Sequence, residues 1–176
     1  MPHIHTEKNQ HDLTVTAYII RTDTPEPKAL VHMHKKLSRL LPIGGHVELL
    51  ETPWQAIGHE LEEESGYILD QLKIVQPVSR ITHLSAVNQH PYLLSMNTHT
   101  ISETHLHTDI EYGFVTDQDP RSALADGESV DLRWLTRAEL VALDESVIYE
   151  NTKEIYLFFF DEVLAHWDTV DTGEFA

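Results

Sequence analysis

The 176-residue sequence contains no cysteine, which excludes disulfide bonds, thiolate metal ligands and a cysteine nucleophile. It also lacks any run of about 18 apolar residues, so no membrane-spanning helix and no membrane partner are expected. The N-terminal segment MPHIHTEKNQHD has no apolar core of the kind that signal peptides carry. These absences together predict a cytoplasmic protein.

Basic residues are few, with 12 Lys and Arg against 29 Asp and Glu, for a formal net charge of −17. A field of this sign repels nucleic-acid phosphates and anionic membranes. A long nucleic acid is therefore not an expected partner without a bound metal or a local basic patch. The 13 histidines are numerous for this length, and each can titrate or bind a metal.

The length suits one compact domain, and neither a repeat nor a low-complexity linker divides it. We expect a single domain over residues 1–176 that ends in a short polar tail at about 168–176. Apolar and β-branched patterns predict strands at 13–21, 28–34, 72–81, 90–100, 105–116 and 129–135. Helical patterns predict helices at 53–65, 137–143 and 150–167. Strands flanked by a middle helix and a terminal helix favour an α/β fold with helices on both faces of a mixed sheet.

The helix predicted at 53–65 has clear start and stop signals. Thr52 is placed to cap its N-terminus, Pro53 suits the first helical position, and Gln55 completes a capping box. Gly66 is placed to end the helix in a left-handed turn. The residues at helical spacing that would face the core are Trp54, Ile57 and Leu61.

The same helix crowds carboxylates. Glu60 and Glu64 fall close together at about 100° per residue, with Glu63 on the adjoining edge, and they border the apolar stripe. No Lys or Arg lies between Glu51 and Gly66 to offset their repulsion. A bound divalent cation is the better candidate, because carboxylate oxygens with water are the ligands that Mg²⁺ and Mn²⁺ prefer.

The segment GHVELLETPWQAIGHELEEESGY resembles the signature of the Nudix hydrolases. Seven positions of that signature are filled in register, by Gly45, Glu51, Glu60, Leu61, Glu63, Glu64 and Gly66. Two positions depart from it: His59 stands where the family has arginine, and Tyr67 stands where it has an apolar residue.

The resemblance implies a Nudix-type α/β/α sandwich around a mixed β-sheet. It also implies metal-dependent hydrolysis of a nucleoside diphosphate linked to another group, with Mg²⁺ or Mn²⁺ as cofactor. The implied metal ligands are Glu60, Glu64 and Glu63 together with the carbonyl of Gly44, and the implied supports of the entering loop are Gly45 and Glu51. A loop glutamate, Glu128, is the candidate catalytic base, and the alternative is that it is only an exposed loop residue.

His59 leaves a second hypothesis open. A neutral histidine supplies neither the fork of donors nor the permanent charge of arginine. The alternative is a catalytically weakened Nudix-fold module that binds a ligand or regulates. A third reading is an acidic interaction domain whose motif match is coincidental. The sequence does not identify the nucleotide derivative, and it leaves the oligomeric state open, with a homodimer as one option.

A second polar group lies in the strand predicted at 105–116. His105, His107, Asp109 and Glu111 alternate, so in a strand they share one face. We interpret His105, His107 and Asp109 as a substrate-binding wall, with a metal contact as an option; the alternative is a polar sheet face without a ligand. A zinc-protease helix is excluded, because Glu63 stands where the second histidine would be required.

Overall fold

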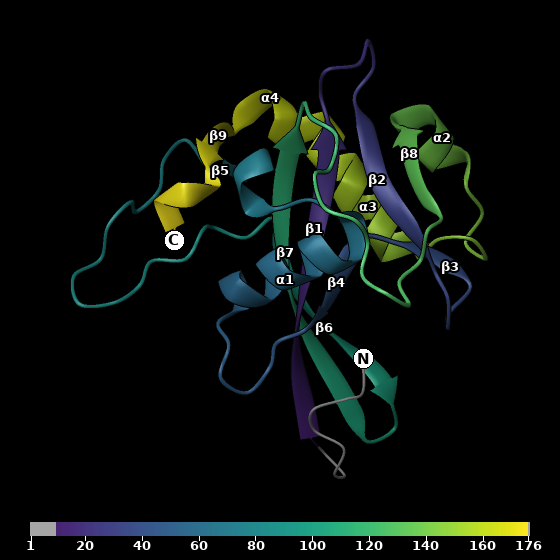
Figure 1. Ribbon diagram of the computed structural model, residues 1–176, viewed down its shortest axis with the longest axis horizontal. Helices are drawn as coiled ribbons and strands as arrows, with labels where there is room; N and C mark the ends of the chain where they lie inside the picture. Colours follow the sequence, from purple (N-terminus) through teal and green to yellow (C-terminus); the bar gives the residue numbers. More distant parts are fainter. Residues whose placement is uncertain (1–9, 176) are drawn as a thin grey trace.

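The computed structural model describes residues 10–175 and shows nine strands in one mixed sheet. The strands follow the order β3-β2-β1-β7-β5-β9, and β4, β6 and β8 pair with β1, β7 and β2 respectively (Figure 1). Their bounds are β1 Gln10–Arg21, β2 Lys28–His34, β3 Arg39–Leu41, β4 Ile43–His46, β5 Lys73–Gln76, β6 Ser95–Ser102, β7 His105–Thr116, β8 Leu132–Thr136 and β9 Asp168–Asp171. The long central strands β1 and β7 run parallel, whereas the other strand pairs are antiparallel.

The helices cover both faces of this sheet, with α1 in front of the central strands and α3 behind them in Figure 1. Their bounds are α1 Pro53–Ser65, α2 Arg137–Ala142, α3 Glu150–Phe158 and α4 Leu164–His166; η1 Leu69–Gln71 and η3 Thr172–Phe175 are 3₁₀ turns, and η2 Phe159–Val163 is a π-helical segment. The predicted α/β/α sandwich around a mixed sheet is therefore confirmed.

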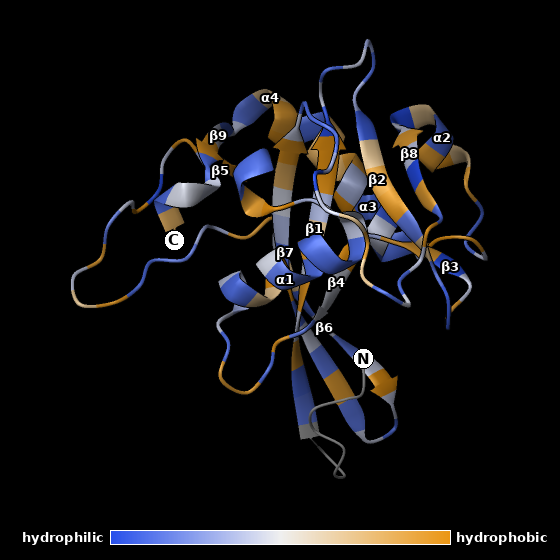
Figure 2. Cartoon of the chain, viewed as in Figure 1, coloured by the Kyte–Doolittle hydropathy of each residue, from blue (hydrophilic) through white to orange (hydrophobic). Residues whose placement is uncertain are grey.

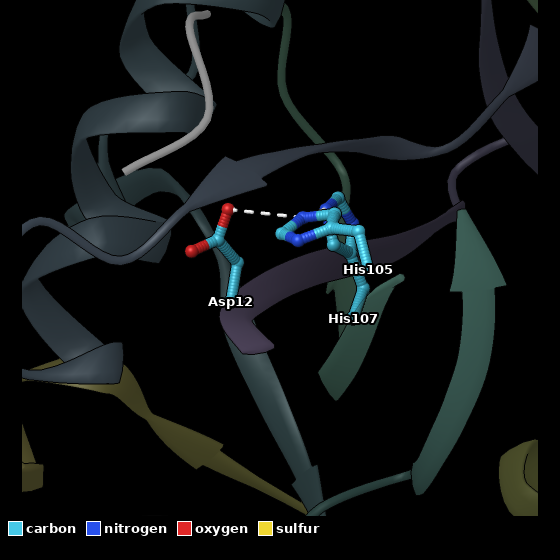
Figure 3. A group of neighbouring side chains, drawn as sticks. All are labelled: Asp12, His105 and His107. Atoms are coloured by element: carbon cyan, nitrogen blue, oxygen red, sulfur yellow. Dashed lines mark hydrogen bonds and ion pairs between the residues drawn. The ribbon is translucent and has the colours of Figure 1, made fainter. Parts of the chain in front are cut away.

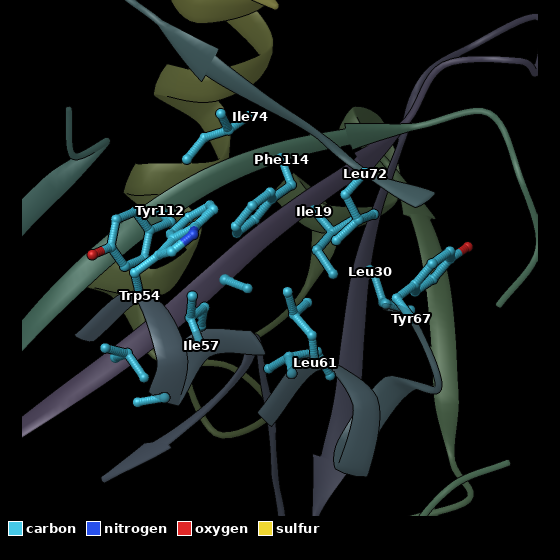
Figure 4. Packing of buried hydrophobic residues seen from close by; sticks show 14 of the residues in the cluster. Ile19, Leu30, Trp54, Ile57, Leu61, Tyr67, Leu72, Ile74, Tyr112 and Phe114 are labelled. Carbon is cyan, nitrogen blue, oxygen red and sulfur yellow. The ribbon is translucent and has the colours of Figure 1, made fainter. Parts of the chain in front are cut away.

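Two apolar clusters hold the layers together. Trp54 and Ile57 of α1 pack with Phe114 of β7 on one face, and the Trp54 and Tyr112 rings meet edge to face at 5.5 Å (Figure 4). Phe159 lies in a second cluster on the other face, with residues of β1 and β2. The lower ends of β1 and β7 in Figure 2 are mainly hydrophilic, so the polar end of the sheet projects beyond its apolar core.

Strand β1 changes partner along its length. Its end pairs with β2, at Ile20 opposite Ala29, whereas its middle pairs with β4, at Thr16 opposite Gly44. β2 and β4 therefore occupy the same side of β1 at different heights. This arrangement brings the chain that enters α1 against the middle of the central strand.

Several boundaries differ from the prediction. The segment 72–81 forms a strand only at β5, because Pro77 lacks the N–H that a continuing ladder needs, and β6 begins at Ser95 rather than at residue 90. The helix predicted at 150–167 is interrupted by the π-helical segment η2. Residues 168–171, expected in a polar tail, instead form β9, which pairs with β5.

Within residues 10–175, no helix is long and apolar enough to cross a membrane. The N-terminal segment MPHIHTEKNQHD, which lacks an apolar core, falls largely on residues 1–9, and these lie outside the described residues.

Candidate functional site

The start and end of α1 are fixed by the interactions that the sequence predicts. The Thr52 hydroxyl accepts a hydrogen bond from the Gln55 N–H at 3.3 Å, and the Gln55 side chain accepts one from the Thr52 N–H at 2.9 Å. Gly66 ends the helix with φ of 73°, and its N–H donates to the Glu62 carbonyl at 3.1 Å. The glutamates of the last two turns are therefore held on a helix with both ends defined.

Glu60 is the buried member of the acidic group, and Glu64 is partly buried. Glu60 is only 4% exposed, and burial raises its pKa to about 8, with smaller contributions from the charges of Glu64, Glu63 and Glu128. Burial likewise raises the pKa of Glu64 to about 7, opposed by a hydrogen bond from the Gly44 N–H. Both shifts mean that negative charge at this place is poorly compensated by the protein itself.

Gly44 brings the backbone of β4 against the helix. Its N–H donates to Glu64 Oε2 at 3.0 Å. A Cβ at Gly44 would lie 2.2 Å from the Val15 carbonyl oxygen, so no larger residue fits this pairing of β4 with β1. Gly45 follows, opposite Val15. Glycine at position 44 thus permits the close approach that fixes one carboxylate.

His32 lies beside Glu64 without offsetting its charge. Its Nε2 is 3.8 Å from Glu64 Oε2, and burial lowers the pKa of His32 to about 4. At neutral pH the imidazole is therefore uncharged.

The loop before β8 closes the other side of the group. The Ala125 N–H donates to the Glu63 carbonyl at 2.9 Å, which ties the loop to the end of α1. Glu128, partly buried in this loop, lies close enough that its charge raises the pKa of both Glu60 and Glu64. Glu63 itself is exposed. The structure thus brings together the four glutamates that the sequence singled out.

His59 occupies a bridging position. Its Nδ1 lies 2.5 Å from Glu51 Oε1, although the His59 side chain is 71% exposed. The other oxygen of Glu51 accepts a hydrogen bond from the Glu48 N–H at 3.2 Å. Glu51 therefore links the loop before α1 to the helix through His59.

Polar residues of β7 lie one strand beyond β1 from Gly44. Thr16 stands opposite Gly44 of β4 and opposite Glu111 of β7, so these three residues follow one another across adjacent strands. Asp109 accepts hydrogen bonds from the hydroxyls of Thr16 at 2.7 Å and Thr14 at 3.1 Å, and burial raises its pKa.

His105 and His107 lie farther toward the start of the same strand, on the face that Asp109 shares. Their neighbours are Asp12 of β1 and His46 of β4, which sequence reasoning missed. The alternation of Asp12, Thr14 and Thr16 in β1 was the available signal, but the pairing of β1 with β7 spans more than 90 residues and no local pattern reveals it.

Comparison with known proteins places this geometry in a family. The family model of the NUDIX domain matches residues 11–159. A solved hydrolase of the NUDIX family from Clostridium perfringens is 27% identical, with a TM-score of 0.70, and the match covers 85% of this chain and 96% of that one.

Two more distant structures share the fold. The Ap4A hydrolase of C. elegans is 15% identical, with a TM-score of 0.60 and coverage of 85% and 96%. The NUDIX domain of Shewanella oneidensis NrtR, solved with ADP ribose, is 13% identical, with a TM-score of 0.58 and coverage of 84% and 85%. None of the curated proteins matched significantly. The chain therefore belongs to the NUDIX family, which confirms the prediction of a Nudix-type hydrolase acting on phosphoanhydride bonds.

Proposed function

We propose that this protein is a divalent-metal-dependent pyrophosphohydrolase that cleaves a nucleoside diphosphate linked to another group. The observation that carries the proposal is the pair of buried Glu60 and partly buried Glu64, whose pKa values are raised to about 8 and about 7 in a segment without Lys or Arg. A cation that binds at this pair would relieve their repulsion and attract an anionic substrate.

The donor set suits Mg²⁺ or Mn²⁺. Both are hard cations that prefer carboxylate and carbonyl oxygens and retain positions for water and substrate phosphates. Glu60 and Glu64 would be the principal ligands, with Glu63 as a further one and the Gly44 carbonyl as a backbone ligand. When bound, the metal would neutralise phosphate oxygens and lower the pKa of a bound water.

The remaining residues would position these groups and move the proton. The Gly44 N–H holds one oxygen of Glu64 in place. Glu128, on the loop tied to α1, is the proposed base that takes a proton from the attacking water. Glu51 and His59 would keep the entering loop against the helix. Removal of either contact would then misplace the ligands rather than remove one.

The polar face of β7 is the proposed substrate-binding wall. Glu111 of β7 pairs with Thr16 of β1, and Thr16 pairs with Gly44 of β4. Asp109 precedes Glu111 by two residues on the same face of β7. A substrate whose phosphates lie at the glutamates would extend its other end along this face, past Asp109 toward His107 and His105. The Ap4A and ADP ribose named for two related structures are both nucleotides with linked phosphates, which supports this substrate class.

A second candidate is a ligand-binding module with weakened catalysis. His59 in place of arginine motivates it, since the exposed imidazole contacts Glu51 through one nitrogen where arginine would present a fork. This candidate predicts tight binding of a nucleotide derivative without turnover.

The test is phosphate or nucleotide release from a panel of nucleoside diphosphate derivatives and triphosphates, with Mg²⁺, with Mn²⁺ and with chelator. We expect metal-dependent turnover that falls at least about 100-fold in Glu64→Gln. The lost carboxylate would be a ligand of the metal, and the metal would stabilise the charge on the reacting phosphates. Glu62→Gln is the matched control: it removes one negative charge from an exposed residue of the same helix, and its turnover should stay within about threefold of wild type.

Near-normal turnover in Glu64→Gln would contradict the assigned site. Substrate binding without turnover across the whole panel would favour the ligand-binding module, and His59→Arg would then be the first variant to assay.

A further inference from the structure

Three side chains from two strands converge at the polar end of the sheet, away from the glutamates of α1. Asp12 of β1 stands opposite His107 in the parallel pairing with β7, and His105 precedes His107 by two residues on the same face. Figure 3 shows the Asp12 carboxylate directed at the two imidazole rings.

The distances between their ligand atoms match those around a small cation. His105 Nε2 lies 3.3 Å from Asp12 Oδ2 and 3.1 Å from His107 Nε2, and one ligand atom from each residue lies within 4.8 Å of the others. Ligands at about 2.0–2.1 Å from Zn²⁺ in a tetrahedral site are separated by roughly 3.3 Å. Two of the three separations are already close to this value.

Further imidazoles surround the trio. His46 of β4 places Nε2 3.5 Å from Asp12 Oδ2, and its ring centroid is 4.9 Å from that of His107. His99 of β6 packs its ring 5.6 Å from the ring of His107. Four strands thus contribute imidazole or carboxylate groups to one place.

The carboxylate of this group is fully buried, whereas the imidazoles of His105 and His46 are partly exposed to solvent. The Asp12 side chain is 0% exposed, whereas those of His105 and His46 are 12% and 11% exposed. A buried carboxylate orients the group, and partly exposed imidazoles leave an entry path. The net charge of −17 also raises the local concentration of cations.

The donor types select the class of metal. Imidazole nitrogens with one carboxylate suit Zn²⁺, Fe²⁺ and similar transition metals, whereas Mg²⁺ prefers oxygen ligands. Two imidazole nitrogens that face each other at 3.1 Å share at most one proton, but both can donate lone pairs to a metal ion.

We propose that Asp12, His105 and His107 bind a divalent transition-metal ion of the zinc class, with His46 as the nearest fourth ligand. This site is separate from the glutamates of α1 and does not depend on the proposed hydrolase activity. It lies on the sheet face that carries Asp109, so the ion would stand at the far end of the proposed substrate wall, and His105 and His107 would contribute to that wall as metal ligands.

The test is titration of the full chain, free of any affinity tag, with Zn²⁺ by calorimetry and with Co²⁺ by visible absorption. The Glu64→Gln variant serves as background, so that the carboxylate site on α1 is weakened. We expect one equivalent of tightly bound Zn²⁺ and the intense absorption of four-coordinate Co²⁺. His105→Asn and Asp12→Asn should each lower the affinity at least about 100-fold, because the loss of a direct ligand should exceed the roughly 10- to 100-fold loss that follows removal of an outer-shell partner.

His166→Asn is the matched control, because His166 is an exposed histidine on α4 and its loss should leave Zn²⁺ affinity unchanged. His107→Asn supplies a second ligand variant, and circular dichroism of each variant without metal shows whether it has folded. No saturable binding of Zn²⁺, or equal affinity in the folded ligand variants and in wild type, would overturn the proposal and leave a hydrogen-bonded cluster.

Turnover of wild type with Mg²⁺ reports the proposed function separately. Zn²⁺ binding without Mg²⁺-dependent turnover would contradict the hydrolase proposal alone, and turnover without Zn²⁺ binding would contradict the transition-metal site alone.

Discussion

Glu111 shows at the scale of one residue how the polar face of β7 is held inside the fold. The side chain is 1% exposed, and its Oε1 accepts hydrogen bonds from the Tyr18 hydroxyl at 3.3 Å and from the Asn97 amide at 3.0 Å. Burial, aided by the charge of Asp109, raises its pKa from 4.5 to about 7. The folded protein therefore holds this proton more tightly than the unfolded chain does.

The sign of the resulting pH dependence follows from linkage. Between pH 4.5 and about 7 the unfolded chain binds fewer protons at Glu111 than the folded protein does, so the free energy of unfolding falls as pH rises through this range. Glu111→Gln keeps an oxygen for Tyr18 and Asn97 but does not ionise. We expect the variant to be more stable than wild type at pH 8 by about 2 kcal/mol, and similar to it at pH 4.5.

Urea unfolding at several pH values measures this difference. Glu154→Gln, which removes an exposed glutamate of α3, is the control and should keep the pH slope of wild type. An unchanged slope in Glu111→Gln would show that the buried carboxylate does not retain its proton in the folded state.

At the scale of elements, the sequence predicts best what local chemistry decides. The capping boxes of α1 and α2 involve residues three positions apart, and both are present. Strand β7 has the predicted bounds, 105–116, because polar and apolar residues alternate through its middle and β-branched and aromatic residues continue to its end. β4 was not predicted: IGGH has little strand propensity, and its backbone pairs with β1 some 30 residues earlier.

The residues of the candidate site also differ in whether a local pattern predicts them. The glutamates of α1 follow from helical periodicity, whereas Asp12 and His46 join His105 and His107 only through pairings of β1 with β7 and β4. The residue pattern of β1 does not predict which strand pairs with it or in which register, because contacts distant in sequence decide both.

A comparison of the two glycines with positive φ tests how much the left-handed turn at the end of α1 contributes to stability. Gly66 has φ of 73° and Gly127 has φ of 97°, but a Cβ at Gly66 would lie 2.3 Å from the Ser122 carbonyl oxygen, whereas nothing lies within 4 Å of one at Gly127. Gly127→Ala should therefore cost only the backbone strain, about 1–2 kcal/mol. Gly66→Ala adds a clash with a backbone atom and should cost about 2–5 kcal/mol in total.

Thermal or urea unfolding of both variants gives the comparison. The larger loss in Gly66→Ala should be accompanied by reduced metal-dependent turnover, because the loop that carries Glu128 attaches to this helix end through the Gly66 carbonyl and the Ser122 N–H. Equal costs for the two variants would mean that the loop moves aside without penalty.

At the scale of the whole molecule, the sheet is completed by the last residues of the described chain. The sequence predicted a polar tail because only one residue of DTVD is apolar. In the structure that residue, Val170, is 7% exposed and stands opposite Ile74 of β5. Phe175 packs its ring 5.8 Å from that of Trp54, and the Thr172 hydroxyl donates to the Leu69 carbonyl at 2.7 Å. The C-terminal segment thus covers one end of the cluster that positions α1.

Deletion of residues 168–176 should therefore destabilise the fold and impair the site on α1 together. The deletion exposes the edge of β5 and removes the Val170 and Phe175 contacts, for an expected loss of about 2–5 kcal/mol in the free energy of unfolding. Val170→Ala, which keeps the backbone pairing, should cost less, about 1–2 kcal/mol, and Asp171→Asn, on an exposed side chain, should cost almost nothing. Urea unfolding ranks the three variants. An unfolding midpoint of the deletion variant equal to that of wild type would mean that β9 lies against the sheet without supporting it, and Trp54 would then be positioned by Tyr112 and Phe114 alone.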